Sequence, residues 1–136
     1  MMTCHSKVVF TIPGPAKAKG RPRMNIRTGR IYTPGDTHKY EKLVRESYGD
    51  NPCFENQFIN IKILFKFEVP KSYSKKKRDE ALAGNLRPTK GDIDNYIKSV
   101  LDGLNKVAFL DDRYICNITA EKMFAEESET IVEIKN

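Results

Sequence analysis

The segment FINIKILFKFEV, residues 58–69, carries the clearest secondary-structure signal in the sequence. Its apolar residues recur at every second position, with polar residues between them for much of its length. Because successive side chains of a β-strand point to opposite faces, this alternation predicts a strand with one face packed against a core. The inward-facing residues are expected to be Ile59, Ile61, Ile63, Phe65 and Phe67.

The region before this strand predicts a strand, an irregular basic segment and a helix. Residues 7–12 are rich in β-branched residues and are followed by a Pro-Gly-Pro breaker, which favours a short strand. Residues 16–37 lack a sustained period and predict a basic loop or ribbon, with a hairpin tip around Thr28 and Gly29. Residues 37–50 have apolar residues at helical spacing and predict a helix capped by their first residue, a threonine.

The region after the strand predicts two more helices and two strands. Residues 72–84 favour a short helix, capped by a serine and closed near its last residue, a glycine. Ile93, Ile97, Val100, Leu101 and Leu104 recur at the spacing of one helical face, and the asparagine that follows is a plausible C-terminal stop in the left-handed conformation. Two β-rich runs, 113–124 and 130–136, predict an antiparallel hairpin.

These elements together predict an α+β fold, with a mixed β-sheet and about three helices. The length of 136 residues is that of one domain, so residues 1–136 are expected to form a single domain. No run of 18 apolar residues and no signal-peptide pattern occur, which predicts a cytoplasmic protein without a membrane partner. Cys4, Cys53 and Cys116 are odd in number and far apart, which argues against disulfides and structural zinc.

The net charge of +6 is unevenly distributed. Two stretches, 14–35 and 71–78, contain basic residues and no acidic ones. Such patches favour polyanions, nucleic acid above all. The residues expected to contact DNA are Lys17, Lys19, Arg21, Arg23, Arg27, Arg30, Lys75, Lys76, Lys77, Arg78 and Lys90.

The segment GDIDNYIKSVLDGLNKVAFLDDR, residues 91–113, instead gathers five aspartates in 23 residues. Each has an ordinary explanation: Asp92 can cap the helix, Asp94 can pair with Lys98 four residues later, and Asp111 and Asp112 can form a turn. Taken together they suggest a metal site, because clustered carboxylates repel one another unless a cation neutralises them.

An all-oxygen ligand set without histidine or cysteine suits Mg²⁺ or Mn²⁺. The chain between Leu104 and Asp112 is long enough to fold back toward Asp94, and a second subunit is an alternative source of the other acidic pair. A divalent metal on a basic protein suggests phosphodiester hydrolysis, in which the metal activates water and lysine and arginine hold the backbone.

Residues 92–115 resemble the RusA-type Holliday junction resolvases, in the pattern D-x-D-N-x-x-K-x-x-x-D-x-L followed by an apolar stretch and D-D. Residues 14–34 and 70–84 are also similar to Gram-positive and phage members, so the resemblance covers most of the chain. One departure is Gly91, where many relatives have proline; it is expected to loosen the entry to the helix.

The resemblance implies a RusA-like fold and a homodimer that cuts four-way DNA junctions by paired symmetric incisions. It implies Mg²⁺ or Mn²⁺ held by Asp92, Asp94 and Asp112, with Lys98 acting on the scissile phosphate. Accessory residues would be Asp111, Asn95 and Asp102. Such proteins occur in bacteria, phages and prophages. The alternatives are a non-catalytic branched-DNA-binding protein that retains the fold and a nuclease that prefers flaps or other branched DNA.

Overall fold

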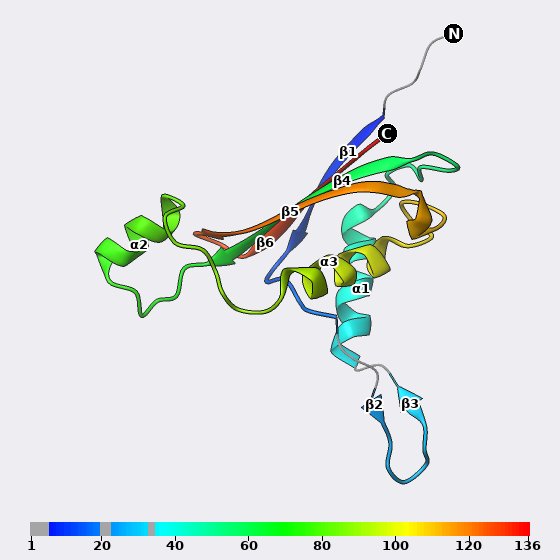
Figure 1. Ribbon diagram of the computed structural model, residues 1–136, viewed down its shortest axis with the longest axis horizontal. Coiled ribbons are helices and arrows are strands. Elements are labelled where there is room, and N and C mark those ends of the chain that lie inside the picture. The colour runs from blue at the N-terminus through cyan, green and yellow to red at the C-terminus, as the bar shows by residue number, and fades with distance from the viewer. Residues whose placement is uncertain (1–5, 20–22, 33–34) are drawn as a thin grey trace.

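The computed structural model describes residues 6–19, 23–32 and 35–136. Figure 1 shows a twisted sheet with two helices, α1 and α3, on one side of it. A third helix, α2, stands apart beyond one end of the sheet, and a small two-stranded hairpin projects away from the helices. The predicted α+β class, with a mixed sheet and three α-helices in the described part of the chain, is confirmed.

The main sheet has the strand order β1-β6-β4-β5. Its strands are β1 (Lys7–Pro13), β4 (Ile59–Glu68), β5 (Ile115–Ala125) and β6 (Glu129–Lys135). The central strand β4 is parallel to β5 and antiparallel to β6, so the sheet is mixed as expected. The parallel pair requires a crossover, and the chain between β4 and β5 supplies it by passing through α2 and α3.

The predicted hairpin between the last two strands is wrong, because β4 lies between β5 and β6. The three-residue connection crosses the end of β4, where the Val69 N–H donates to the Ala125 carbonyl at 3.1 Å. The Glu68 N–H donates to Ser128 Oγ at 2.9 Å. The strand with the most apolar face thereby has a neighbour on both edges, which buries it more fully than a local hairpin would.

The helices begin and end close to their predicted bounds: α1 is Gly35–Tyr48, α2 is Lys75–Leu82 and α3 is Ile93–Leu104. Helix α1 starts two residues before Thr37, which therefore lies in its first turn rather than at its N-cap. Ser74 caps α2 by accepting a hydrogen bond from the Lys77 N–H at 3.2 Å, as predicted. No helix among the described residues is both long and apolar enough to cross a bilayer.

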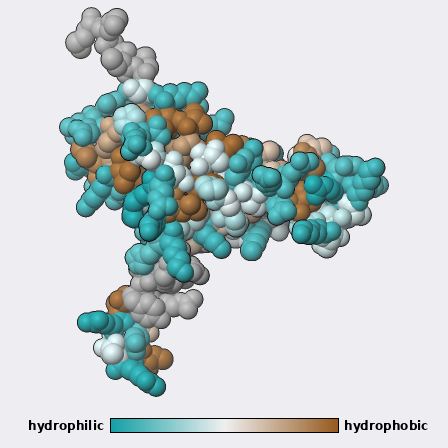
Figure 2. Space-filling view, turned by 180° about the vertical axis from the view of Figure 1, so that it is seen from behind, coloured by the Kyte–Doolittle hydropathy of each residue, from teal (hydrophilic) through white to brown (hydrophobic). Residues whose placement is uncertain are grey.

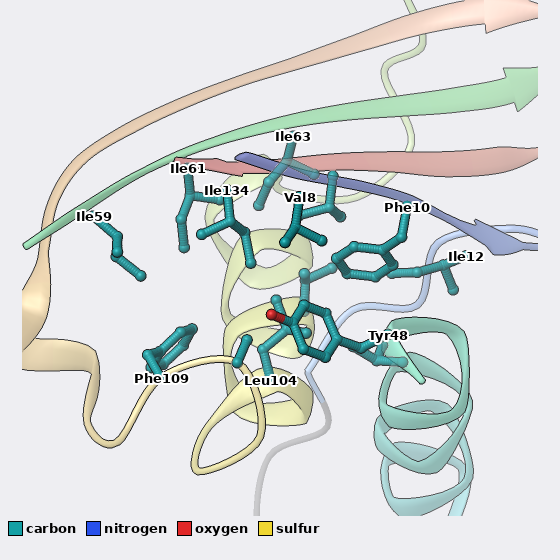
Figure 3. Packing of buried hydrophobic residues seen from close by; sticks show 14 of the residues in the cluster. Val8, Phe10, Ile12, Tyr48, Ile59, Ile61, Ile63, Leu104, Phe109 and Ile134 are labelled. Atoms are coloured by element: carbon teal, nitrogen blue, oxygen red, sulfur yellow. The ribbon is translucent and has the colours of Figure 1, made fainter. Parts of the chain in front are cut away.

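The core lies between the sheet and the pair α1 and α3 (Figure 3). Ile59, Ile61, Ile63 and Phe65 of β4 are buried on this face, as the alternation predicted. Gly103 of α3 lies against α1, where an added Cβ would be 2.7 Å from Val44 Cβ. The glycine that weakens α3 as an isolated helix therefore permits the two helices to approach closely.

Candidate metal and DNA site

Helix α3 sets the positions of the predicted acidic residues. Its buried face contains Tyr96, Val100 and Leu104, so that Asp94 and Lys98 remain on the exposed side. At its N-terminus, the Tyr96 hydroxyl donates to the Lys90 carbonyl at 3.1 Å and holds the incoming chain.

Gly91 fixes the entry to α3 rather than loosening it. Its φ of +73° is one that residues with a Cβ rarely adopt, and a side chain at this position would collide with the Tyr96 ring. The expectation that glycine in place of proline loosens the helix entry is therefore wrong.

The carboxylates at the N-terminal end of α3 are unpaired within the described residues. Asp92 occupies the N-cap position, but its side chain accepts no capping hydrogen bond. Asp94 and Lys98 form no ion pair with each other, and both are exposed. Burial raises the pKa of the Tyr96 hydroxyl, and the nearby charge of Asp92 raises it further. The ordinary structural explanations for Asp92 and Asp94 are thus not realised.

A second acidic pair lies just before β5. Asp111 Oδ1 accepts a hydrogen bond from the Arg113 N–H at 2.9 Å and caps a single 3₁₀ turn, Asp112–Tyr114. This backbone hydrogen bond lowers the pKa of Asp111. The pKa of Asp112 is raised, chiefly by its hydrogen bond with Asp111, and then by burial and by the charges of Asp111 and Asp102. The two neighbouring carboxylates therefore shift each other's pKa in opposite directions.

The two acidic groups lie at opposite ends of α3 within the chain. Helix α3 has 12 residues and is about 18 Å long, and Asp92 is about 15 Å from Asp102, whose charge reaches Asp112. Ligand oxygens on one Mg²⁺ lie within about 4 Å of one another, since each is about 2.1 Å from the ion. Accordingly, no group of three or more His, Cys, Asp or Glu residues in the described chain is arranged to hold a metal.

The accessory residues Asn95 and Asp102 take part in contacts with the N-terminal segment. Lys19 Nζ pairs with Glu41 Oε1 at 2.7 Å and with Asp102 Oδ2 at 2.9 Å. The Lys19 N–H donates to the Asn95 carbonyl at 3.1 Å. Burial disfavours the charge of Lys19, but the two hydrogen-bonded carboxylates outweigh it and raise the pKa of Lys19. Lys19 thus joins the N-terminal segment to α1 and α3 and directs its charge inward.

The other basic residues differ in how free they are to bind DNA. Lys17, Arg27, Arg30 and Lys90 are exposed, whereas Arg21 and the side chain of Arg23 lie outside the described residues. On α2, Lys75, Lys76 and Lys77 are exposed and Arg78 is half-buried. Lys77 Nζ lies 4.1 Å from the centre of the Tyr73 ring.

The surface of α2 is less basic than the run 71–78 suggested. A hollow of about 560 Å³ there is lined by Asp79 and Glu80 as well as by Lys75 and Lys76. The helix brings these acids beside the lysines because residues three and four apart share a face. The net charge offered to DNA at this hollow is therefore small.

Lys122 is a candidate that the sequence did not indicate. Its Nζ donates to the Gly91 carbonyl at 2.8 Å and to the Lys90 carbonyl at 3.3 Å, which places a cation directly before Asp92. Lys122 comes from β5, 30 residues later in the chain. No local pattern marks it, and only the pairing of β4 with β5 beneath α3 brings it to this place.

Comparison with known proteins identifies the family of the chain. Residues 13–135 match the family described as "Endodeoxyribonuclease RusA". The chain is also 33% identical over 135 residues to a protein of Bacillus subtilis (strain 168) named "Uncharacterized protein YqaN", and the match covers 94% of this chain and 95% of that protein. The match covers nearly the whole chain, including the start of α3 with Asp92 and Asp94 and the acidic turn, Asp111 and Asp112, before β5. The chain therefore belongs to the RusA endodeoxyribonuclease family.

Proposed function

We propose that this protein is a metal-dependent, structure-selective endodeoxyribonuclease that resolves four-way DNA junctions by paired symmetric incisions. The observation that carries the proposal is that Asp92, Asp94 and Lys98, on one exposed helix end of a basic protein, form no ion pair with any other residue that the structure describes. Membership of a family of DNA-cleaving enzymes supports it. The proposed setting is the cytoplasm of a bacterium, with the gene carried by the host, a phage or a prophage.

Asp92, Asp94 and Asp112 would hold Mg²⁺ or Mn²⁺, with Asp111 beside them. The donor set fits such an ion, because it is made of carboxylate oxygens and Asp92 is free of the capping contact that would otherwise occupy it. The bound metal would supply activation of water and neutralisation of charge on the phosphate. Lys98, one turn along α3 from Asp94, would hold the scissile phosphate as a point charge.

The metal site needs a second copy of the chain, because one protomer separates its acidic groups by the length of α3. A twofold homodimer can place Asp92 and Asp94 of one protomer beside the acidic turn of the other. Two such composite sites would then face two equivalent strands of a junction and would make the proposed paired incisions. Catalysis would therefore depend on dimerisation.

The edge of β5 is the surface that suits this dimer. β5 is the last strand of the sheet, and Cys116, Asn117, Ile118 and Thr119 on it are exposed. The strand starts just after Asp112 and passes Gly91 at Lys122. Antiparallel pairing of two β5 edges would therefore bring the start of one strand, and its acidic turn, to the end of the other, where the partner's α3 begins.

A cleavage assay tests the proposal. The protein is incubated with a synthetic four-way junction and Mg²⁺, and symmetric nicks in opposing strands are expected. Asp92→Asn and Asp112→Asn should abolish cleavage while junction binding is kept or strengthened, because the loss of a carboxylate relieves repulsion of phosphate. Lys98→Ala should reduce cleavage more than affinity. Asp79→Asn on α2 is the matched control and should cut normally.

A non-catalytic protein that binds branched DNA is the alternative, and the distance between the acidic groups in one protomer favours it. It predicts junction binding without nicks in any divalent metal. Retained cleavage by Asp92→Asn would instead reject the assigned ligands. Competition between junctions and flaps in the same assay identifies the preferred branched substrate.

A further inference from the structure

The hairpin formed by β2 (Arg23–Met24) and β3 (Ile31–Tyr32) is an isolated, internally ordered projection. Figure 1 shows it extending away from the sheet and the helices. Its tip is closed by hydrogen bonds: the Asn25 N–H donates to the Arg30 carbonyl and the Gly29 N–H to the Asn25 carbonyl, both at 2.7 Å. The side chain of Asn25 also accepts from the Arg27 N–H at 2.9 Å. The described strands and tip thus form a ribbon of defined shape.

This ribbon exposes large apolar side chains that no core covers. Ile26 near the tip is 95% exposed, Ile31 is 73% exposed and Met24 is 64% exposed. Figure 2 shows hydrophobic and hydrophilic surface side by side on the projection at the bottom of the molecule. Three exposed apolar residues on a ten-residue ribbon lower the solubility of the protein. Their exposure is explained if a binding partner covers them.

The charges around these residues identify the partner. Arg27 and Arg30 are exposed and form no ion pair within the described residues, and residues 14–35 contain no acid. A second copy of this basic chain would bring like charges together, whereas DNA neutralises them. Some DNA-binding proteins combine basic residues with apolar side chains that insert between neighbouring bases and partly unstack them.

We infer that the β2–β3 hairpin is a wedge that inserts Ile26 between unstacked bases at a DNA branch point, with Arg27 and Arg30 on the flanking phosphates. The inference rests on the proposed function and assigns to this segment the selection of branched over linear DNA. Unstacking a base step in a duplex costs a few kcal/mol, and the cost is least where pairing is already interrupted, so a wedge favours branches.

The position of the hairpin in the chain suits this role. The Lys19 N–H is bonded to the first turn of α3 at Asn95, and the hairpin begins four residues later, within about 14 Å of chain. The base of the hairpin therefore lies near the end of α3 that carries Asp92 and Asp94, and the tip at Ile26, seven residues after Lys19, lies within about 25 Å of chain. A branch held by the wedge lies within reach of the proposed cutting site.

Fluorescence of 2-aminopurine placed at the branch point of a synthetic four-way junction tests the inference. Binding is measured in Ca²⁺ in place of Mg²⁺ to prevent cutting, and a duplex of matched length and sequence serves as the linear probe. Wild-type protein should raise the fluorescence of the junction by unstacking the base. Ile26→Ser should abolish this rise and weaken junction affinity about tenfold, with duplex affinity changed less than about twofold.

Two variants provide matched controls. Val9→Ser removes an apolar side chain that is 55% exposed on the sheet and should leave the fluorescence rise and both affinities unchanged. Arg27→Gln should weaken junction and duplex alike, since phosphate contacts carry no branch information.

An equal fluorescence rise with wild type and Ile26→Ser overturns the wedge, and retained junction cleavage by both would leave the proposed function standing. Wild-type protein that neither prefers nor cuts the junction overturns both proposals.

Discussion

Mixing two inactive variants, Asp92→Asn and Asp112→Asn, should restore nicking if the metal site is built across the dimer. In the mixed dimer one composite site contains both substitutions, and the other contains Asp92 and Asp112 intact, one from each chain. If the site lay within one protomer, each chain would be inactive and mixing would restore nothing. Both outcomes assume the same metal ligands. They differ only in whether Asp92 and Asp112 of one site come from two chains or from one.

The geometry of α3 requires a shared site, and random pairing of the two variants sets the expected magnitude. Carboxylates about 15 Å apart along an intact helix cannot share an ion that each must approach to about 2.1 Å. Random association of equal amounts gives about half mixed dimers, each with one intact site of two. The mixture should therefore contain about a quarter of the wild-type sites.

A supercoiled plasmid with an extruded cruciform distinguishes the products. Wild-type dimers should linearise it by paired cuts, whereas mixed dimers have one working site and should yield nicked circles. Mixing Asp92→Asn with Asp94→Asn is the matched control, since both residues come from the same end of α3 and every composite site then carries a substitution. Purified mixed dimers of the first pair that fail to nick would refute the trans arrangement.

Three further substitutions test the fold that supports the site. Lys19→Met should lower the free energy of unfolding by about 1–3 kcal/mol in urea titrations because it leaves the buried Glu41 with only its 3.9 Å contact to Arg45, and adding Glu41→Gln should recover part of the loss. Gly103→Ala should cost about 1–2 kcal/mol in the same titrations, since the new Cβ meets Val44; equal stability would show that α1 and α3 can separate. Burial raises the pKa of the Tyr48 phenol to about 12, so the stability from its neutral form is complete below pH 10 and lost as the pH rises through about 12. Tyr48→Phe should remove this titration from ultraviolet difference spectra and flatten alkaline unfolding.

Much of the fold could be predicted from local sequence. The alternation of residues 58–69 predicted β4 and its buried face, and the apolar spacing of residues 93–104 predicted α3. Both signals are strong because burying one face of a strand or helix requires apolar side chains at the spacing that the backbone geometry sets. The hairpin tip at Thr28 and Gly29 was also predicted, since glycine there has the positive φ that the turn needs.

Pairing between distant segments could not be predicted in the same way. The β-rich runs 113–124 and 130–136 form strands, but their local pattern is compatible with pairing to each other or to β4. Likewise Asn105 ends α3 in an extended conformation, and the left-handed residue is Lys106, with a φ of 68°. The pairing of strands and the conformation at the end of a helix depend on which arrangement buries more of the whole chain. The order of residues along the sequence does not reveal which arrangement that is.

For the candidate site, the sequence by itself determined the identity of the carboxylates, their all-oxygen chemistry and the helix that presents Asp92 and Asp94, because these depend on residue type and short spacing. Only the tertiary structure decided that Asp112 lies at the far end of α3, that Lys19 is turned inward and that Lys122 stands before Asp92. The reason is that a parallel β4–β5 pair forces α3 to run back along the sheet, and this one crossover separates in space what the sequence placed within 21 residues.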